Sequence, residues 1–155
     1  MIQRIQSVYL SLIVLISLLL FKGSLLVFTE NTGSVINVTF NGIFRDTNGQ
    51  GIVMIESLLP LSILIVLVPV VSMITIFLFK KRNVQLLLVK FLIGLLSAFI
   101  LGSSFYIYLI LSKYSSEFIP GIKMAIPFIL LILAILALKG IRKDDQLVKS
   151  YDRLR

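Results

Sequence analysis

The apolar residues of this chain are gathered into four long runs that contain no charged residue. These runs are Ile5–Phe21, Ser57–Phe79, Phe91–Ser112 and Met124–Leu138, of 17, 23, 22 and 15 residues. A helix needs about 20 such residues to cross roughly 30 Å of hydrocarbon. The second and third runs reach this length as they stand. The first reaches it if the helix continues past Lys22 to Phe28, and the fourth if Lys123 and Lys139 lie at the two interfaces.

The pattern predicts an all-α membrane protein whose 155 residues form one four-helix transmembrane bundle. We expect the spans at about residues 5–28, 57–79, 86–112 and 122–140. An outer loop, 29–56, separates the first two spans, and a tail, 141–155, follows the last.

Lys and Arg residues fall on alternate sides of these spans. The 80–90 connection holds Lys80, Lys81, Arg82 and Lys90 with no acidic residue, and six basic residues follow the last span. The outer loop region has two basic residues and three acidic ones. Because cytoplasmic connections carry the excess of Lys and Arg, both termini are expected in the cytoplasm.

The outer loop is the only sizeable polar segment, and two interpretations of it remain open. Ser34–Phe40 is rich in β-branched residues, with Ile36, Val38 and Phe40 on one face of a strand, and Asn41-Gly42 is a strong hairpin turn signal. These features favour a β-hairpin or a small sheet of two or three strands. An isolated hairpin is only marginally stable in water, so a flexible loop is the alternative. Pro120-Gly121 predicts a turn between the last two spans.

Composition agrees with the membrane assignment and removes several kinds of chemistry. Hydrophobic residues make up 58% of the chain and charged residues 14%, against about 45–50% and 25% in soluble domains. The chain has no Cys and no His, which excludes disulfides, thiol nucleophiles and imidazole metal ligands. The net charge is +8, and the basic residues cluster beside the apolar runs. This position indicates the anionic membrane surface as their partner rather than nucleic acid.

No ionisable residue falls in the interior of any predicted span. Proton relays and ion-coupled transporters need such groups at depth. An active site would have to use interfacial acids, namely Glu30, Asp46, Asp144 and Asp145, and nothing in their spacing supports one. The sequence therefore predicts no enzyme, no catalytic residue, no metal site and no cofactor.

Two features of the spans concern helix packing. Gly94, Ala98 and Gly102 recur every four residues and form a smooth ridge on which another helix can approach closely. We favour packing inside the bundle over an interface with another subunit, and we expect Leu95 beside the ridge to face lipid. Pro69 lies in the middle of the second span and predicts a kink, which is either a simple bend or a gate.

The tail has an apolar stripe if it is helical. Leu147, Tyr151 and Leu154 then follow Ile141 along one side, with charges elsewhere. One interpretation is a segment that docks a cytoplasmic partner, and the other is a solvated, frayed end.

The two ends of the chain resemble a known family. The opening Met1-Ile2-Gln3-Arg4-Ile5-Gln6 and the closing Asp152-Arg153-Leu154-Arg155 are similar to those of small bacterial four-span membrane proteins classed only as a domain of unknown function. The resemblance covers the whole chain and implies four helices in the inner membrane. It implies no activity and no catalytic residues.

These observations lead to two hypotheses about function. The first is a non-enzymatic accessory or scaffold subunit of a membrane complex, which contacts the lipid bilayer and other membrane proteins, or a cytoplasmic partner through its tail. The alternative is a small channel or a transporter for an apolar or lipid-like substrate.

Overall fold

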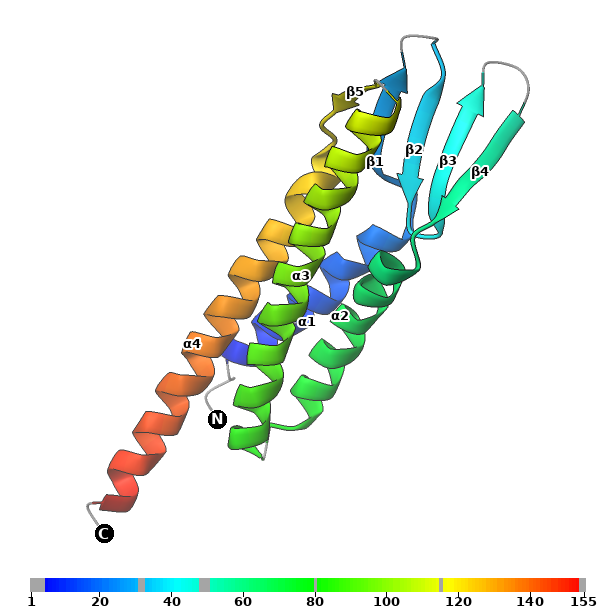
Figure 1. Ribbon diagram of the computed structural model, residues 1–155. Helices are drawn as coiled ribbons and strands as arrows, with labels where there is room; N and C mark the ends of the chain where they lie inside the picture. Colours follow the sequence, from blue (N-terminus) through cyan, green and yellow to red (C-terminus); the bar gives the residue numbers. More distant parts are fainter. Residues whose placement is uncertain (1–4, 31–32, 48–50, 80, 115, 154–155) are drawn as a thin grey trace.

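The protein is a bundle of helices with an antiparallel sheet at one end (Figure 1). The computed structural model describes residues 5–30, 33–47, 51–79, 81–114 and 116–153. Its long helices are α1 (Ile5–Ser17), α2 (Leu59–Phe77), α3 (Arg82–Tyr114) and α4 (Ile126–Arg153). Two short 3₁₀ helices, η1 (Leu18–Phe21) and η2 (Ile122–Ala125), lie at the end of α1 and the start of α4.

The four long helices form a ring in which each contacts two neighbours. α1 and α3 both pack against α2 and α4. The side chains at the centre are almost all aliphatic, with Leu10, Leu92 and Leu130 fully buried. The outside is also apolar, since Leu87, Leu101 and many similar residues are exposed. Helices that are hydrophobic all round are typical of membrane spans, and α2, α3 and the η2–α4 segment are long and apolar enough to cross a membrane.

The sheet has five strands in the order β4-β3-β2-β1-β5, and every pair is antiparallel. The strands are β1 (Ser24–Glu30), β2 (Val35–Thr39), β3 (Gly42–Thr47), β4 (Gly51–Ser57) and β5 (Ser116–Ile119). The first four are consecutive in sequence, whereas β5 comes from the connection between α3 and α4. By pairing with β1, β5 joins the two connections at this end of the bundle into one sheet.

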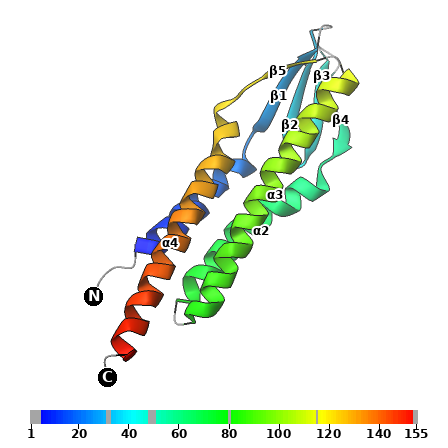
Figure 2. The ribbon, with the colours of Figure 1, turned by 60° about the vertical axis from the view of Figure 1, so that its left-hand side comes forward.

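The inner face of the sheet lies against the last turns of α3, as the turned view shows (Figure 2). Leu26, Phe28, Ile36, Val38 and Ile43 point to this face and are buried. α3 spans about 50 Å at 1.5 Å per residue, which is more than a membrane requires. Its final turns, which include the buried Ile110, therefore serve as a support for the sheet.

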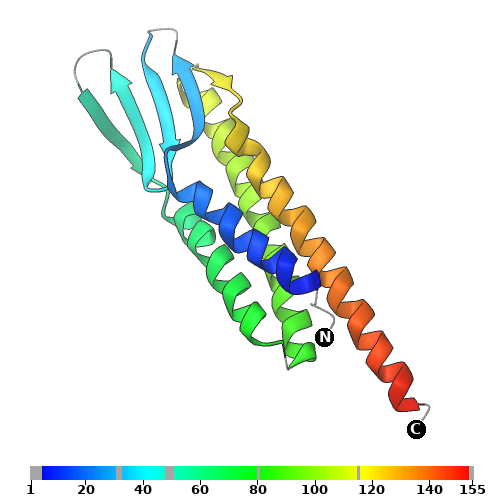
Figure 3. The same ribbon diagram turned by 180° about the vertical axis from the view of Figure 1, so that it is seen from behind.

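Residues 24–28 correct the predicted first span. They form the start of β1, so the helix does not continue to Phe28. The backbone of Gly23 has a φ of 70°, in the left-handed region where a helix ends, and Lys22 before it is extended. The view from behind shows the chain leaving α1 directly into the sheet (Figure 3).

The predicted outer loop also needs correction. Residues 35–39, 42–47 and 51–57 form strands, so the flexible-loop interpretation is wrong and the sheet is larger than the two or three strands expected. A hairpin forms here as predicted, but its turn is Phe40-Asn41 rather than Asn41-Gly42, because Gly42 is already the first residue of β3. The fourth helix runs unbroken from Ile126 to Arg153, so most of the tail, 141–155, continues that helix.

Replacing Phe28 with Ala is expected to destabilise the whole protein. The Phe28 side chain is fully buried, pairs with Ile36 and stacks on Phe118 with ring centroids 5.2 Å apart. Such a deletion typically costs about 3–5 kcal/mol of the free energy of unfolding. Thermal unfolding in detergent measures it, with Phe105→Ala as the control because Phe105 is 59% exposed. Equal losses of melting temperature in the two variants would contradict the proposed core.

Candidate functional site

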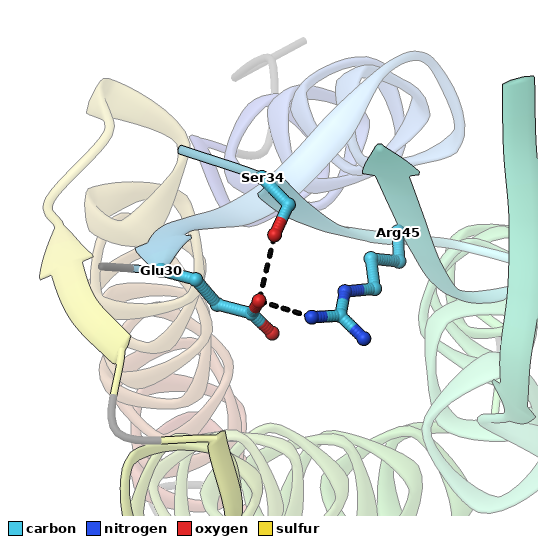
Figure 4. Close-up of polar contacts among 3 residues, drawn as sticks. All are labelled: Glu30, Ser34 and Arg45. Carbon is cyan, nitrogen blue, oxygen red and sulfur yellow. Dashed lines mark hydrogen bonds and ion pairs between the residues drawn. The ribbon is translucent and has the colours of Figure 1, made fainter. Parts of the chain in front are cut away.

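A polar cluster lies on the inner face of the sheet, at the far end of β1 (Figure 4). Glu30 from β1 accepts a hydrogen bond from the Ser34 hydroxyl at 2.6 Å and forms an ion pair with Arg45 from β3. The Glu30 side chain is 5% exposed and the Arg45 side chain 36%. The ion pair connects β1 to β3 across β2, so it fixes the register of three strands.

This cluster suits a structural role rather than catalysis. It holds one carboxylate, already neutralised by Arg45. Asp46 is exposed on the opposite face of the sheet, because neighbouring residues of a strand alternate in direction. Asp144 and Asp145 lie in the last part of α4, away from the sheet. Among the described residues no three acidic side chains gather to hold a metal ion.

The edge strand β4 presents an apolar surface. Ile52, Val53 and Met54 are 71%, 58% and 49% exposed, and β4 pairs only with β3 in the described part of the chain. Ile52 lies five extended residues before Ser57, about 17 Å from the point where the strand meets α2. An exposed edge strand offers unpaired backbone N–H and C=O groups to another polypeptide.

A cleft lies where the bundle meets the sheet. Its walls come from η1, β1, β2, α2, α3 and the start of α4, and its volume is about 520 Å³, part of it open to the surroundings. Most of the lining is aliphatic or aromatic, including Leu26, Leu61 and Phe99. Lys123 lies at its border and donates a hydrogen bond to the backbone carbonyl of Lys22.

The predicted glycine ridge of α3 divides into two parts. Gly94 and Ala98 are exposed, and a Cβ at Gly94 would meet nothing within 4 Å. A Cβ at Gly102 would lie 3.3 Å from Leu61 Cδ1 of α2. The prediction that the ridge packs inside the bundle is therefore wrong for Gly94 and Ala98, and it holds only for Gly102. Leu95 is 9% exposed and belongs to the core, so the expectation that it faces lipid is also wrong.

The remaining predicted residues do not converge on a site. Helix α2 is continuous through the half-buried Pro69, and Pro69 does not line the cleft. The kink stays a prediction. The side chains of Leu147 and Tyr151, and all of Leu154, lie outside the described residues, so docking through the tail also stays a prediction.

Sequence reasoning missed the residues that the fold brings together from distant positions. Lys22 and Lys123 are 101 residues apart. Lys22 was predicted to lie within the first span, and Lys123 at the interface end of the last. Arg45 was counted as a loop charge, although it lies opposite Ile36 in the sheet. The exposure of Ile52–Met54 could not be foreseen, because the edge position of β4 depends on β5 joining the other side.

Replacing Gly102 with Leu is expected to lower the melting temperature in detergent. The new side chain would displace Leu61 and separate α2 from α3, and overpacking of this kind costs about 1–3 kcal/mol. Gly94→Leu is the matched control: it meets open space and gains helix propensity, so stability should not fall. If both variants lost the same amount of melting temperature, Gly94 would be covered by another part of the chain, which would contradict its exposed position.

Comparison with known proteins gives a family but no activity. No curated protein and no solved structure matches the chain significantly. The family model described as a domain of unknown function, DUF4293, matches residues 2–154. This match confirms the resemblance to a family of unknown function over nearly the whole chain. The protein, with its apolar bundle and its five-stranded sheet, therefore belongs to the DUF4293 family.

Proposed function

We propose that this protein is a non-enzymatic accessory or scaffold subunit of a complex in the bacterial inner membrane. In this proposal the chain crosses the membrane four times, with both ends in the cytoplasm and the sheet on the outer side. The exposed apolar edge of β4 is the observation that carries the assembly role, because it is a surface for another polypeptide beyond the membrane.

The length of the first helix supports a fourth span. α1 has 13 residues and η1 has 4, which together extend about 28 Å at 1.5 and 2.0 Å per residue. This is close to the roughly 30 Å of the hydrocarbon core. The 3₁₀ turn gives more length per residue than an α-turn, which helps a run of only 17 residues to cross.

The distribution of charge supports the orientation. At the sheet end the basic residues are Lys22, Arg45, Lys113 and Lys123, and they are balanced by Glu30, Asp46, Glu56 and Glu117. The other eleven of the 15 Lys and Arg residues belong to segments nearer the opposite end, with only three acids. The predicted cytoplasmic segments thus hold eleven Lys and Arg residues against four at the sheet end, as the rule for cytoplasmic segments requires.

Two further surfaces suit an assembly subunit. The outward-facing Gly94 and Ala98 of α3 form a smooth strip where a helix of another subunit can approach closely. The last part of α4 extends past the other helices on the side of the N-terminus (Figure 1). In the proposed orientation this end of the helix is cytoplasmic, which is the side that docking through Leu147, Tyr151 and Leu154 would require.

The cleft between the bundle and the sheet favours a second candidate function, transport of an apolar or lipid-like substrate. Its lining is apolar and it lies at the depth of the membrane surface in the proposed orientation. A transporter needs a path from this cleft to the opposite side. The bundle below it is closed by buried side chains such as Leu92, Leu96 and Leu130, so the assembly role is better supported.

Replacing Ile52 and Val53 of β4 with Ser is expected to dissociate the complex and leave the fold intact. Both side chains are more than half exposed, so their loss removes little from the core of the chain itself. Native electrophoresis of membranes solubilised in mild detergent measures the size of the assembly, and a photo-reactive residue at position 54 identifies what contacts the strand.

The matched control replaces Ile119 and Ile122 with Ser. These residues are 46% and 93% exposed, and Ile119 lies in the opposite edge strand β5. The wild type and this control should migrate in the same large complex, whereas the β4 variant should migrate as the free chain. A wild-type chain that migrates alone and cross-links to no protein would overturn the assembly role.

A further inference from the structure

We propose that the cleft at the junction of bundle and sheet binds an anionic phospholipid, with one acyl chain in the cleft and the phosphate at Lys123 and Lys22. This inference rests on the membrane placement given under the proposed function, but not on the assembly role. The bound lipid would lie in the cleft, which is separate from the exposed surface of β4.

The shape of the cleft suits one chain of a lipid. It is a narrow groove, because its free space of about 520 Å³ includes the open mouth and only about 40 Å³ can hold the centre of a water-sized sphere. It is bounded by α3 and α4 on two sides, and the exposed Ser104 and Phe128 lie on its lining, so it opens between these helices. In the proposed orientation that opening faces the acyl chains of the outer leaflet.

The charge at the mouth is positive and fixed in position. The Lys123 ammonium donates to the Lys22 carbonyl and lies where a side chain at position 23 would be: a Cβ on Gly23 would be 2.9 Å from Lys123 Nζ. Lys22, whose carbonyl accepts this hydrogen bond, has an exposed side chain. Within the described part of the chain neither lysine forms an ion pair with a carboxylate. The Lys123 ammonium at the border of an apolar cleft, with the exposed Lys22 on the adjoining segment, is complementary to a lipid phosphate.

The head group, rather than the acyl chain, is the part of the lipid that determines which lipid binds. An acyl chain that moves from the bilayer into the cleft exchanges one apolar environment for another, so it gains little from the hydrophobic effect. The head group then decides which lipid binds, and lipids with identical chains should be discriminated by charge.

Native mass spectrometry of the full chain in detergent tests this inference. Phosphatidylglycerol and phosphatidylcholine with the same acyl chains are titrated in turn. The wild type should bind phosphatidylglycerol at least about five-fold more tightly, and Lys123→Gln and Lys22→Gln should each reduce that preference about five-fold. Lys113→Gln is the control, because Lys113 is an exposed lysine at the same end that does not line the cleft.

A second pair of variants tests the cleft itself. Ser103→Leu should fill the cleft and weaken binding of both lipids. Ser97→Leu is the matched control and should leave binding unchanged, because Ser97 lies outside the cleft. Like Ser103, Ser97 is a half-buried residue of α3 whose hydroxyl donates to the carbonyl four residues earlier. Wild-type selectivity in both lysine variants, or wild-type binding in Ser103→Leu, would overturn the inference. If the membrane placement itself were wrong, alkali would extract the chain from membranes without detergent. That result distinguishes a wrong placement from a failure of lipid binding.

Discussion

Backbone hydrogen bonding where the first helix ends is the constraint on which the rest of the structure depends. A chain that leaves a helix at a membrane surface must find partners for its N–H and C=O groups. Here Gly23 ends the helical conformation and β1 then pairs on both sides, with β2 and with β5. Because β5 precedes the fourth helix, this pairing determines where α4 begins and brings Lys123 to Lys22.

The sheet and the bundle depend on each other for burial. A small sheet gains stability in water when one of its faces packs on a helix, and the last turns of α3 provide that helix. The Glu30–Arg45 ion pair lies on the same face, where loss of one partner would leave a poorly solvated charge and disfavour other registers. One face of the sheet is thus used for folding, and the β4 edge is the surface that we propose for contacts with other molecules.

The helices could be predicted from sequence because membrane spans are specified locally, by runs of apolar residues such as Ser57–Phe79. The sheet was only partly predictable. Asn41-Gly42 is a local signal that predicted the hairpin to within one residue. Ser24–Phe28 is as apolar as the helix before it and becomes a strand through pairing with distant residues. The site residues were least predictable, since the meeting of Lys22 with Lys123 and the outward position of Gly94 both follow from tertiary packing.

The central claim is that the short first helix crosses the membrane, which puts the N-terminus and the sheet on opposite sides. Single cysteines test this directly, because the chain has none of its own. They are introduced at Gln3, Asp46 and Asn83 and labelled on intact cells with a membrane-impermeant maleimide, given access through the outer membrane. The account predicts labelling of Asp46→Cys at once, and of Gln3→Cys and Asn83→Cys only after the inner membrane is permeabilised. Labelling of Gln3→Cys together with Asp46→Cys from outside would contradict it, because α1 would then not cross.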